Sequence, residues 1–547
     1  MLPSQPWRFF TPCLLALTLA LAASQRAAGQ DSPRTIRIKP TAWSSTGGDD
    51  MARLRQLAGG VGWEFEPNAQ TTAGLKQIGI NRIRCINVDP LTGTFDAQGR
   101  FVANAMPNDR LVAHLATCRE IGAQPHIILA TGLHPDLVLK AADLKTKEPS
   151  LLGMVHQTTF GPTDWGKFRS YCQAYFEYVI LTQGFSGACF EVANEPDAGG
   201  GLIEQPPPTG PGSRRAFEAY FKLYRNVAQA AVEFEQAHPG TKVTLGGPAT
   251  TWAFTFAFGD FNWQEAFLRE VRNQQVKLDF IGLHFYGNLT PLTGAGAIYP
   301  SFAGMTRLTR GWRDTYTPGV PIWLTEWGPT YNTSLDPCSL PNANHVGAAW
   351  TAAFLNQMLI EGIDRAIFLV TTDLRQENQG QGQDIWGWPA LFTNPTVHGT
   401  HPKPPYHVFT MLSRMAPQRV EAMNPGGTVG CLASRDAVTG RLTVLLWNFG
   451  YRIDEFGPGT ELAKTESVML RVVEDEQLLR GRVKISRTLV SQTVSNAYDL
   501  FVKGQPIDQR AELQVVDQAV FRPVDGALHY GFALPPSSVS LVELTPE

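Results

Sequence analysis

The sequence has little charge and no excess of either sign. Of its 547 residues only 17% are charged, the formal net charge is −3, and hydrophobic residues make up 43%. Such an apolar composition excludes a disordered chain. The near-neutral charge argues against a nucleic-acid-binding protein, which usually carries a basic surface. Beyond the N-terminal region the sequence has no apolar run of about 20 residues, so we expect no membrane span in the processed chain.

The first 29 residues differ from the rest of the chain. Arg8 precedes an apolar run, Cys13–Ala23, and small residues follow at 27–29. This pattern predicts a secretory signal peptide over residues 1–29, because the apolar run is too short for a membrane anchor. We therefore expect the protein to be secreted or periplasmic.

Short apolar runs alternate with longer helical stretches through the middle of the chain. The clearest helix is expected at Arg214–Gln236, where apolar residues recur every three or four positions. Short buried strands between amphipathic helices predict a parallel sheet. With Gly60–Glu64 as the first strand, eight such units predict a (β/α)₈ barrel. The seven later strands are expected at Ile83–Val88, Pro125–Ala130, Ala188–Ala193, Lys242–Gly246, Phe280–His284, Pro321–Thr325 and Ala366–Val370.

A doubly wound open sheet is the main alternative to the barrel. Its usual glycine-rich phosphate turn after the first strand is not evident in this sequence. The predicted fold class is therefore α/β, a (β/α)₈ TIM barrel followed by a C-terminal antiparallel β-sandwich.

The pattern changes after about residue 405. Short runs, several of them alternating or β-branched, are separated by Gly, Pro, Asp and Asn turns, which is typical of an antiparallel sandwich. One of these predicted strands is Asp499–Val502. The predicted organisation is a signal peptide (1–29), an N-terminal segment (30–54) whose Thr35–Ile38 could pair with the sandwich, a catalytic barrel (55–404) and the β-sandwich (405–547).

Two glutamates stand at the ends of predicted strands. Glu195 follows the fourth strand and Glu326 ends the seventh, and His284 and Tyr286 end the sixth. The active site of a (β/α)₈ barrel lies at these strand ends, so we expect the two carboxylates to face each other. Glycoside hydrolysis needs such a pair: one acid protonates the leaving oxygen, while the other carboxylate attacks the anomeric carbon or activates water. Glu191, inside the fourth strand, is interpreted as a salt-bridge partner instead.

Several segments resemble known glycoside hydrolases. Residues 189–197 (CFEVANEPD) resemble the acid/base motif of clan A retaining glycoside hydrolases, 322–329 (IWLTEWGP) their nucleophile motif, and 280–287 (FIGLHFYG) the motif of the strand between them. The segments that resemble glycoside hydrolase family 39, the β-xylosidase and α-L-iduronidase group, are 368–374 (FLVTTDL), 387–392 (GWPALF), 403–412 (KPPYHVFTML) and 445–450 (LLWNFG). The resemblance covers roughly residues 55–547 and implies a retaining hydrolase with a barrel and a β-sandwich.

The resemblance also implies a role for each matching residue. Glu195 would be the general acid/base and Glu326 the nucleophile. Asn194 would bind the substrate 2-hydroxyl, through a hydrogen bond that strengthens in the transition state. Arg84 would lie beneath the nucleophile and keep it ionised.

On the sixth strand, Tyr286 would hydrogen-bond the nucleophile, and His284 would line the same wall. Two positions depart from the family pattern. Ala193 stands where the clan often has an aromatic residue, and Asp197 where family 39 usually has asparagine. These departures affect the shape of the pocket and therefore the choice of sugar.

Other candidates for substrate binding lie on loops. His126 and His134 flank the third strand, where the family places polar residues of the sugar pocket. The alternative for both is a loop histidine that simply hydrogen-bonds backbone. Trp327, Trp386 and Trp388 follow the seventh and eighth strands and could stack on a sugar ring, with core packing as the alternative. Trp386 and Trp388 are favoured because they lie in or beside the polar loop Gln376–Gly387.

The sequence therefore predicts a retaining glycoside hydrolase that cleaves oligo- or polysaccharides by double displacement, as a β-xylosidase-like or related exo-glycosidase. Two alternatives are an endo-β-glycanase of another clan A family and a non-catalytic carbohydrate-binding protein on a hydrolase scaffold. No cofactor or metal site is predicted, because the cysteines and histidines show no tetrahedral set with close spacing. The expected partner is a carbohydrate, with no nucleic acid.

Overall fold

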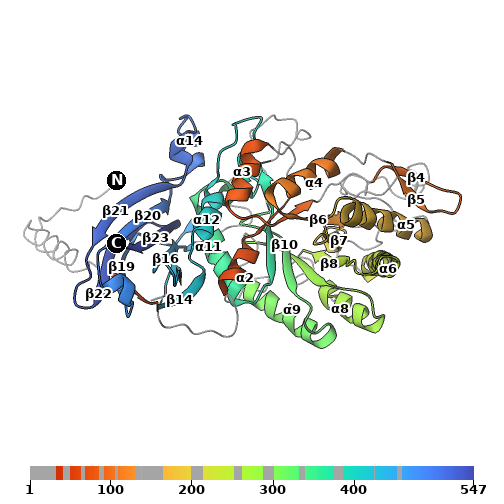
Figure 1. The fold of residues 1–547 in the computed structure, drawn as a ribbon, viewed down its shortest axis with the longest axis horizontal. Coiled ribbons are helices and arrows are strands. Elements are labelled where there is room, and N and C mark those ends of the chain that lie inside the picture. Colours follow the sequence, from red (N-terminus) through yellow and green to blue (C-terminus); the bar gives the residue numbers. More distant parts are fainter. Residues whose placement is uncertain are drawn as a thin grey trace, which may run out of the picture.

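The protein is described by a computed structural model with a barrel at one end and a large sheet at the other. In Figure 1 the barrel runs from orange to green, and the sheet is blue. The described residues are 33–40, 50–62, 68–85, 91–104, 109–129, 137, 164–198, 214–251, 261–287, 301–331, 339–373, 386–423, 426–452 and 459–547.

Eight parallel strands close into a barrel, and each strand is hydrogen-bonded to its neighbour in chain order. The predicted (β/α)₈ barrel is confirmed, and all eight predicted strands are present. Their side chains are buried almost throughout, which explains why the sequence reads as apolar runs. The barrel strands are β2 (Gly60–Gly62), β3 (Arg82–Cys85), β6 (Gln124–Leu129), β7 (Cys189–Val192), β8 (Thr244–Thr250), β9 (Phe280–Tyr286), β10 (Ile322–Gly328) and β11 (Arg365–Phe368).

Helices cover the outside of the barrel (Figure 1). In the predicted amphipathic helix, Tyr220, Tyr224, Val227 and Ala231 form the buried stripe. The helices are α2 (Asp50–Leu57), α3 (Ala69–Gln77), α4 (Asp109–Ile121), α5 (Trp165–Phe176), α6 (Arg214–Ala237), α8 (Trp263–Asn273), α9 (Phe302–Tyr316), α10 (Leu340–Ala343), α11 (His345–Ile360) and α12 (Pro404–Ser413), with a π-helical turn at Glu177–Thr182. Small strands lie in the loops at β4 (Gly93–Phe95), β5 (Phe101–Ala103), β12 (Val370–Thr372) and β13 (Ala390–Phe392).

The C-terminal region is a nine-stranded, mostly antiparallel sheet in the order β21-β20-β23-β16-β15-β14-β1-β19-β22. Strands from both halves of this order bury side chains in one shared apolar core, as the two layers of a sandwich do. β1 lies between β14 and β19, so the N-terminal segment is part of this sheet. The strands are β1 (Arg34–Lys39), β14 (Gln418–Met423), β15 (Val429–Arg435), β16 (Leu442–Asn448), β19 (Glu466–Val473), β20 (Val483–Val490), β21 (Gln514–Phe521), β22 (Ala527–Leu534) and β23 (Ser538–Pro546).

The protein also contains several smaller elements, and at one of them the sequence-based prediction was wrong. The segment predicted as a strand at Asp499–Val502 belongs to helix α14 (Ala497–Val502). Ala497 and Leu500, three positions apart, lie on one side of the helix and pack on Trp386. The buried residues of this segment thus have the spacing of a helix and not that of a strand. The remaining small elements are β17 (Tyr451–Arg452), β18 (Thr460–Glu461), α13 (Glu476–Leu479) and short 3₁₀ turns at Pro196–Ala198 and Gln509–Ala511.

Helix α11 joins the two regions. It is buried on nearly every side, because it contacts the barrel on one face and strands β16 and β23 of the sheet on the other. Its Trp350 and Phe354 pack against Trp327 of the barrel. Helix α12 follows the eighth barrel strand along the chain and packs on α11.

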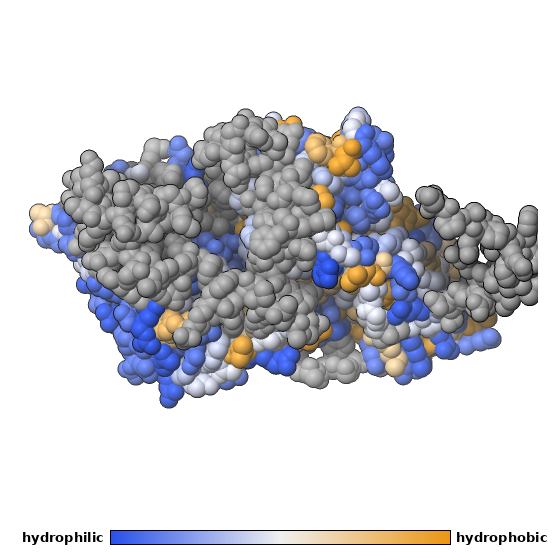
Figure 2. Space-filling model, turned by 180° about the vertical axis from the view of Figure 1, so that it is seen from behind, coloured by the Kyte–Doolittle hydropathy of each residue, from blue (hydrophilic) through white to orange (hydrophobic). Residues whose placement is uncertain are grey.

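The described surface is mainly hydrophilic on the face seen in Figure 2, with hydrophobic residues scattered over it. Among the described helices, none combines the length and the apolar character needed to cross a membrane. The five described cysteines are free thiols: Cys85, Cys118, Cys172 and Cys189 are buried, and Cys431 is half-buried.

Candidate active site

The carboxyl ends of four barrel strands bring the predicted polar residues together. Glu195 follows β7, and Glu326 lies on β10 directly beside His284 of β9. A carboxylate oxygen of Glu195, one of Glu326 and a ring nitrogen of His284 all lie within 4.8 Å of one another. Carboxyl groups in retaining glycosidases are about 5–5.5 Å apart, whereas inverting enzymes need roughly 6.5–9.5 Å to admit a water. The closest oxygens of this pair are too near each other to leave the gap that an inverting enzyme needs, which agrees with a retaining enzyme.

Arg84 on β3 is the centre of the hydrogen-bond network. Its guanidinium is completely buried and donates from Nη1 to Oε2 of Glu326 (3.0 Å), from Nη2 to Oδ1 of Asn194 (2.9 Å) and from Nε to Oε2 of Glu191 (2.9 Å). A buried carboxylate is costly unless it is paired and hydrogen-bonded. Arg84 thus supplies a positive charge directly beside the carboxylate of Glu326, and it binds the carbonyl oxygen of Asn194 and not its amide NH₂.

Two side chains of β9 fix the positions of the glutamates. The hydroxyl of Tyr286 donates to Oε1 of Glu326. His284 contacts Arg84 through Nε2 (3.2 Å) and Oε1 of Glu195 through Nδ1 (2.8 Å). Because arginine has no acceptor atom, Nε2 must accept and Nδ1 must carry the proton. His284 therefore donates to Oε1 of Glu195, which leaves Oε2 as the oxygen that can hold the acid proton.

The two glutamates lie in different electrostatic environments. Burial raises the pKa of Glu195 to about 7, although the charge of Arg84 opposes this shift. Its side chain is still 27% exposed, against 9% for Glu326, so it is the one that opens toward a ligand. Burial also lowers the pKa of His284 to about 4, which keeps the ring neutral, and raises that of Tyr286 well above its usual value. Two carboxyls with such unlike surroundings are typical of an acid paired with a nucleophile.

The backbone that carries Glu195 is strained. Ala193 and Glu195 have positive φ angles of 61° and 48°, and Ala249 on the neighbouring strand has 53°. Non-glycine residues rarely adopt this left-handed region, and strain of this kind concentrates at functional sites. The turn is held by the amide of Glu195, which donates to the carbonyl of Ala249 (3.0 Å), and by Asp197, whose carboxylate accepts from the amide and hydroxyl of Thr251.

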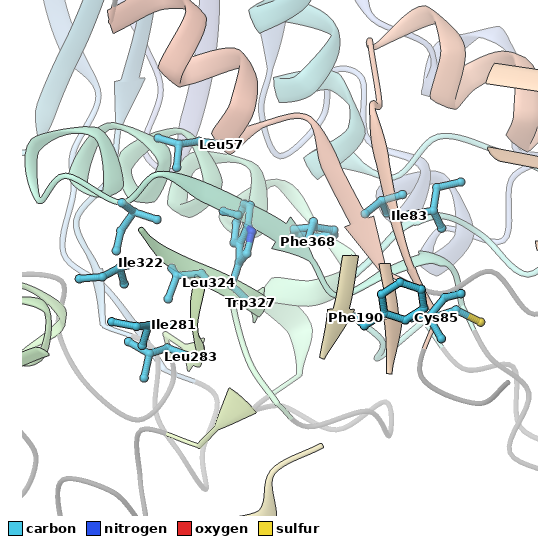
Figure 3. Close-up of a cluster of buried hydrophobic side chains, with 14 of the residues drawn as sticks. Leu57, Ile83, Cys85, Phe190, Ile281, Leu283, Ile322, Leu324, Trp327 and Phe368 are labelled. Carbon is cyan, nitrogen blue, oxygen red and sulfur yellow. The ribbon is translucent and has the colours of Figure 1, made fainter. Parts of the chain in front are cut away.

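The three predicted tryptophans lie in three different places. Trp327 is completely buried among core residues such as Leu324 and Phe368 (Figure 3). Trp386 is also completely buried, and packs on Tyr498 and Phe501 of the sheet region. The structure therefore places both in the protein core, the alternative that the sequence left open.

Trp388 is half-buried and packs against a small cluster that includes Tyr286, the residue whose hydroxyl binds Glu326. His134 and residues 374–385, most of the polar loop, lie outside the described residues. His126 lies within β6, completely buried, and does not belong to a loop.

Two clusters of buried charged residues were only partly predicted from the sequence. Glu191 was expected to form a salt bridge, and it does so with Arg84, but it also accepts a hydrogen bond from His126 Nε2 (3.3 Å). Lys403, at the start of α12, pairs with Asp373 (2.8 Å) and donates to the carbonyls of Trp386 and Trp388. In the sequence, only the position of Asp373 just after the eighth strand hinted at this second cluster.

Among the described residues, Glu195, His284 and Glu326 are the group whose ligand atoms are close enough to hold a metal ion. Their hydrogen bonds do not suit this role, because Arg84 and Tyr286 already occupy both oxygens of Glu326 and His284 Nδ1 carries a proton toward Glu195. A metal would have to displace these donors. The arrangement fits acid/base and nucleophilic chemistry better than metal ligation.

A closed parallel barrel with two glutamates at the ends of its fourth and seventh strands defines a class, the barrel glycoside hydrolases. The family described as glycosyl hydrolases family 39 matches residues 189–500, more than half of the chain. The chain belongs to glycosyl hydrolase family 39 and is a retaining glycoside hydrolase whose substrate is a carbohydrate.

Solved structures with the same fold cover nearly the whole chain. A GH39 enzyme from Xanthomonas axonopodis pv. citri superposes with a TM-score of 0.71 at 18% identity, covering 95% of this chain and 99% of its own. A monomeric β-xylosidase from Caulobacter crescentus CB15 gives 0.67 at 19% identity (94% and 99%). A bacterial orthologue of human α-L-iduronidase gives 0.65 at 14% identity (94% and 84%). At these identities the likeness concerns the fold. No curated protein matches the sequence.

Proposed function

We propose that Glu326 is the nucleophile and Glu195 the general acid/base of a double displacement. The observation that carries this assignment is the close pair of carboxyls with opposite environments: Glu326 is bound by Arg84 and Tyr286, and Glu195 has its pKa raised to about 7. A buried carboxylate held by an arginine and a tyrosine suits attack on carbon, and a carboxyl that is half protonated near neutral pH suits proton transfer in both directions.

The reaction follows from these positions. An oxygen of Glu326 bonds to the anomeric carbon while Glu195 gives its proton to the glycosidic oxygen, and the bond between that carbon and that oxygen breaks. Asn194, oriented by Arg84, binds the 2-hydroxyl in this step. Glu195, now a carboxylate, takes a proton from water, and the resulting hydroxide displaces Glu326 from the anomeric carbon. Two inversions at this carbon give net retention.

The proposed substrate is a neutral sugar at the end of a chain, with a β-xyloside as the first choice. The support is the family, together with structural neighbours named β-xylosidases that are covered over almost their full length. A panel of aryl glycosides, followed by product analysis on plant and microbial polysaccharides, tests this. Monosaccharide products from chain ends support it, and longer oligosaccharide products point to an endo-β-glycanase.

We also propose that the protein is exported, on the support of the signal-like pattern in residues 1–29. The test is the mass of the protein recovered from the periplasm or medium of its source cells. A mature chain that starts near residue 30 supports export, and an intact N-terminus in the cytoplasm contradicts it.

The decisive experiment on the two roles uses Glu195→Ala. Without the acid, substrates with poor leaving groups should lose about 10²- to 10⁴-fold in kcat/KM, whereas dinitrophenyl glycosides, which need no protonation, should lose far less. Azide should restore turnover and yield the glycosyl azide of retained configuration, because a small anion can enter the space of the carboxylate. An equal loss on all substrates, with no azide product, would contradict the assignment of Glu195.

A further inference from the structure

Glu191 lies one layer below the proposed catalytic pair and has no place in the mechanism above. It is completely buried on β7, and its Oε2 accepts from Nε of Arg84 (2.9 Å) and from Nε2 of His126 (3.3 Å). Its Oε1 lies against the backbone of Gly282 on β9, where a Cβ atom would come within 2.3 Å of it. The barrel thus keeps a tight space for a third carboxylate directly beneath the site.

The contact at Nε determines where the rest of Arg84 points. A guanidinium is planar and rigid, so a bond that fixes Nε also fixes the directions of Nη1 and Nη2. Nη1 meets Glu326, and Nη2 meets Asn194 and His284. Each of these partners belongs to the proposed chemistry: the nucleophile, the 2-hydroxyl ligand and the histidine that orients the acid/base.

Glu191 also lies on the far side of the charge that acts on Glu195, which is that of Arg84. Arg84 pairs with both Glu191 and Glu326, so its positive charge is shared between two acidic side chains. Although burial alone would raise it, the pKa of Glu191 is held at about 2 by Arg84 and by the hydrogen bond from His126. His126 and His284 are neutral, because burial lowers the pKa of each to about 4. A nearby negative charge favours the protonated form of a carboxylic acid, whereas Arg84 alone would disfavour it.

We propose that Glu191 is a positioning residue that acts through Arg84: it aims the guanidinium at Glu326, Asn194 and His284, and it offsets part of the positive charge that Arg84 presents to Glu195. This inference rests on the proposed roles of Glu195 and Glu326. Among the described residues, the titratable and charged groups that interact with Glu191 or Glu195 are Arg84, His126, Cys189, Tyr220, His284 and Tyr286, with Glu326 beside Glu195.

The test compares pH profiles of kcat/KM for two variants of the full-length enzyme. Glu191→Gln keeps the shape but removes the charge, so the limb on which activity falls with rising pH should move down by about one pH unit. Glu191→Asp keeps the charge but moves the carboxylate away from Arg84. The pH at which activity falls should therefore stay the same, while kcat falls about 10- to 100-fold because the guanidinium of Arg84 loses its alignment. A merely structural role would lower activity without this split between charge and shape.

Glu361→Gln is the matched control. Glu361 is also a buried glutamate paired with an arginine (Arg310, 2.9 Å), but it lies at the end of α11, outside the barrel. Its loss should leave the pH profile in place. If Glu191→Gln leaves the limb unmoved, or if Glu191→Asp keeps full kcat, the inference is overturned. Should Glu191→Gln fail to fold, the kinetic constants of Glu191→Asp decide: a fall in kcat with KM unchanged supports the inference, and an unchanged kcat or an equal effect on KM overturns it.

Azide rescue of Glu195→Ala distinguishes a failure of this inference from a failure of the proposed function. If azide rescues Glu195→Ala but the pH profile of Glu191→Gln does not shift, only the role of Glu191 is overturned. Absence of rescue overturns the role of Glu195, and with it the ground of the inference.

Discussion

The barrel mouth and the core of the C-terminal sheet are equally shielded from water, yet they are filled in opposite ways. The sheet core consists mainly of hydrophobic side chains, among them Val444, Leu446, Leu470 and Val542, each with no exposed surface, with a few small polar side chains such as the hydrogen-bonded Ser434 and Thr443. The barrel mouth buries Arg84, Glu191, His126, His284 and Glu326, all of them less than one-tenth exposed.

The difference reflects what each region does. Removing an ion from water costs several kcal/mol even after relaxation, and a buried pair repays this only with close partners. An apolar core of the same size stabilises a fold more efficiently. We infer that the sheet and α11 contribute most to the stability of the fold. The barrel mouth contributes less, because its buried charges are arranged for the reaction. Mutations in the two regions should therefore separate activity from stability.

The largest expected effect is that of Glu326→Gln. Loss of the nucleophile should lower kcat by at least about 10⁴-fold, because no other carboxylate can form the covalent intermediate from this position. The folded state should persist, since Arg84 keeps its bond to Glu191. Steady-state kinetics and thermal unfolding measure the two effects. A variant with near-normal turnover would place the nucleophile elsewhere.

The second prediction concerns the sheet core. Leu446→Ala leaves a cavity among completely buried residues and should lower the free energy of unfolding by about 2–5 kcal/mol. Because the barrel mouth is untouched, kcat and KM at 25 °C should stay unchanged while the protein remains folded. Denaturant unfolding and kinetics on the same preparation test this. A large fall in kcat without unfolding would show that the two regions are not separate in function.

The smallest effect is the pH dependence of the unmodified enzyme. Glu195 has its pKa raised to about 7 and must be protonated to act as the acid, so kcat/KM should fall about tenfold per pH unit above that value. An ordinary carboxyl in the same role would give the same fall with rising pH, but at a much lower pH, because it loses its proton well below neutral pH. In Glu195→Gln this limb should disappear for dinitrophenyl substrates. A limb that persists there belongs to another group.

The fold was largely predictable because its signals are local. Each barrel strand is a short apolar run, and Glu195 and Glu326 could be found because they end such runs on opposite sides of the barrel. Other features depend on contacts between segments that lie far apart in the sequence. Trp386 was placed in a sugar pocket, but α14 covers it, and Asp499–Val502 was itself predicted as a strand. The sequence gives no direct sign of such a contact between loop and sheet.

The buried charges were only partly predictable for the same reason. A salt bridge of Glu191 could be anticipated from its position in an apolar strand. That its partner is the arginine that also binds Glu326 depends on the closure of the barrel, which brings β3, β7 and β10 around one guanidinium. The pair of Lys403 and Asp373 likewise joins two ends of the eighth unit that lie 30 positions apart.

The most direct measurement is the location of a trapped glycosyl-enzyme. A 2-deoxy-2-fluoro glycoside with an activated leaving group, made from the sugar that the aryl-glycoside panel selects, should inactivate the enzyme and add one sugar per chain. Peptide mass spectrometry should find that sugar on Glu326, and no adduct should form in Glu326→Gln. An adduct on Glu195 or Glu191, or rapid hydrolysis of the panel substrate with no adduct at all, would contradict the assignment of the barrel mouth.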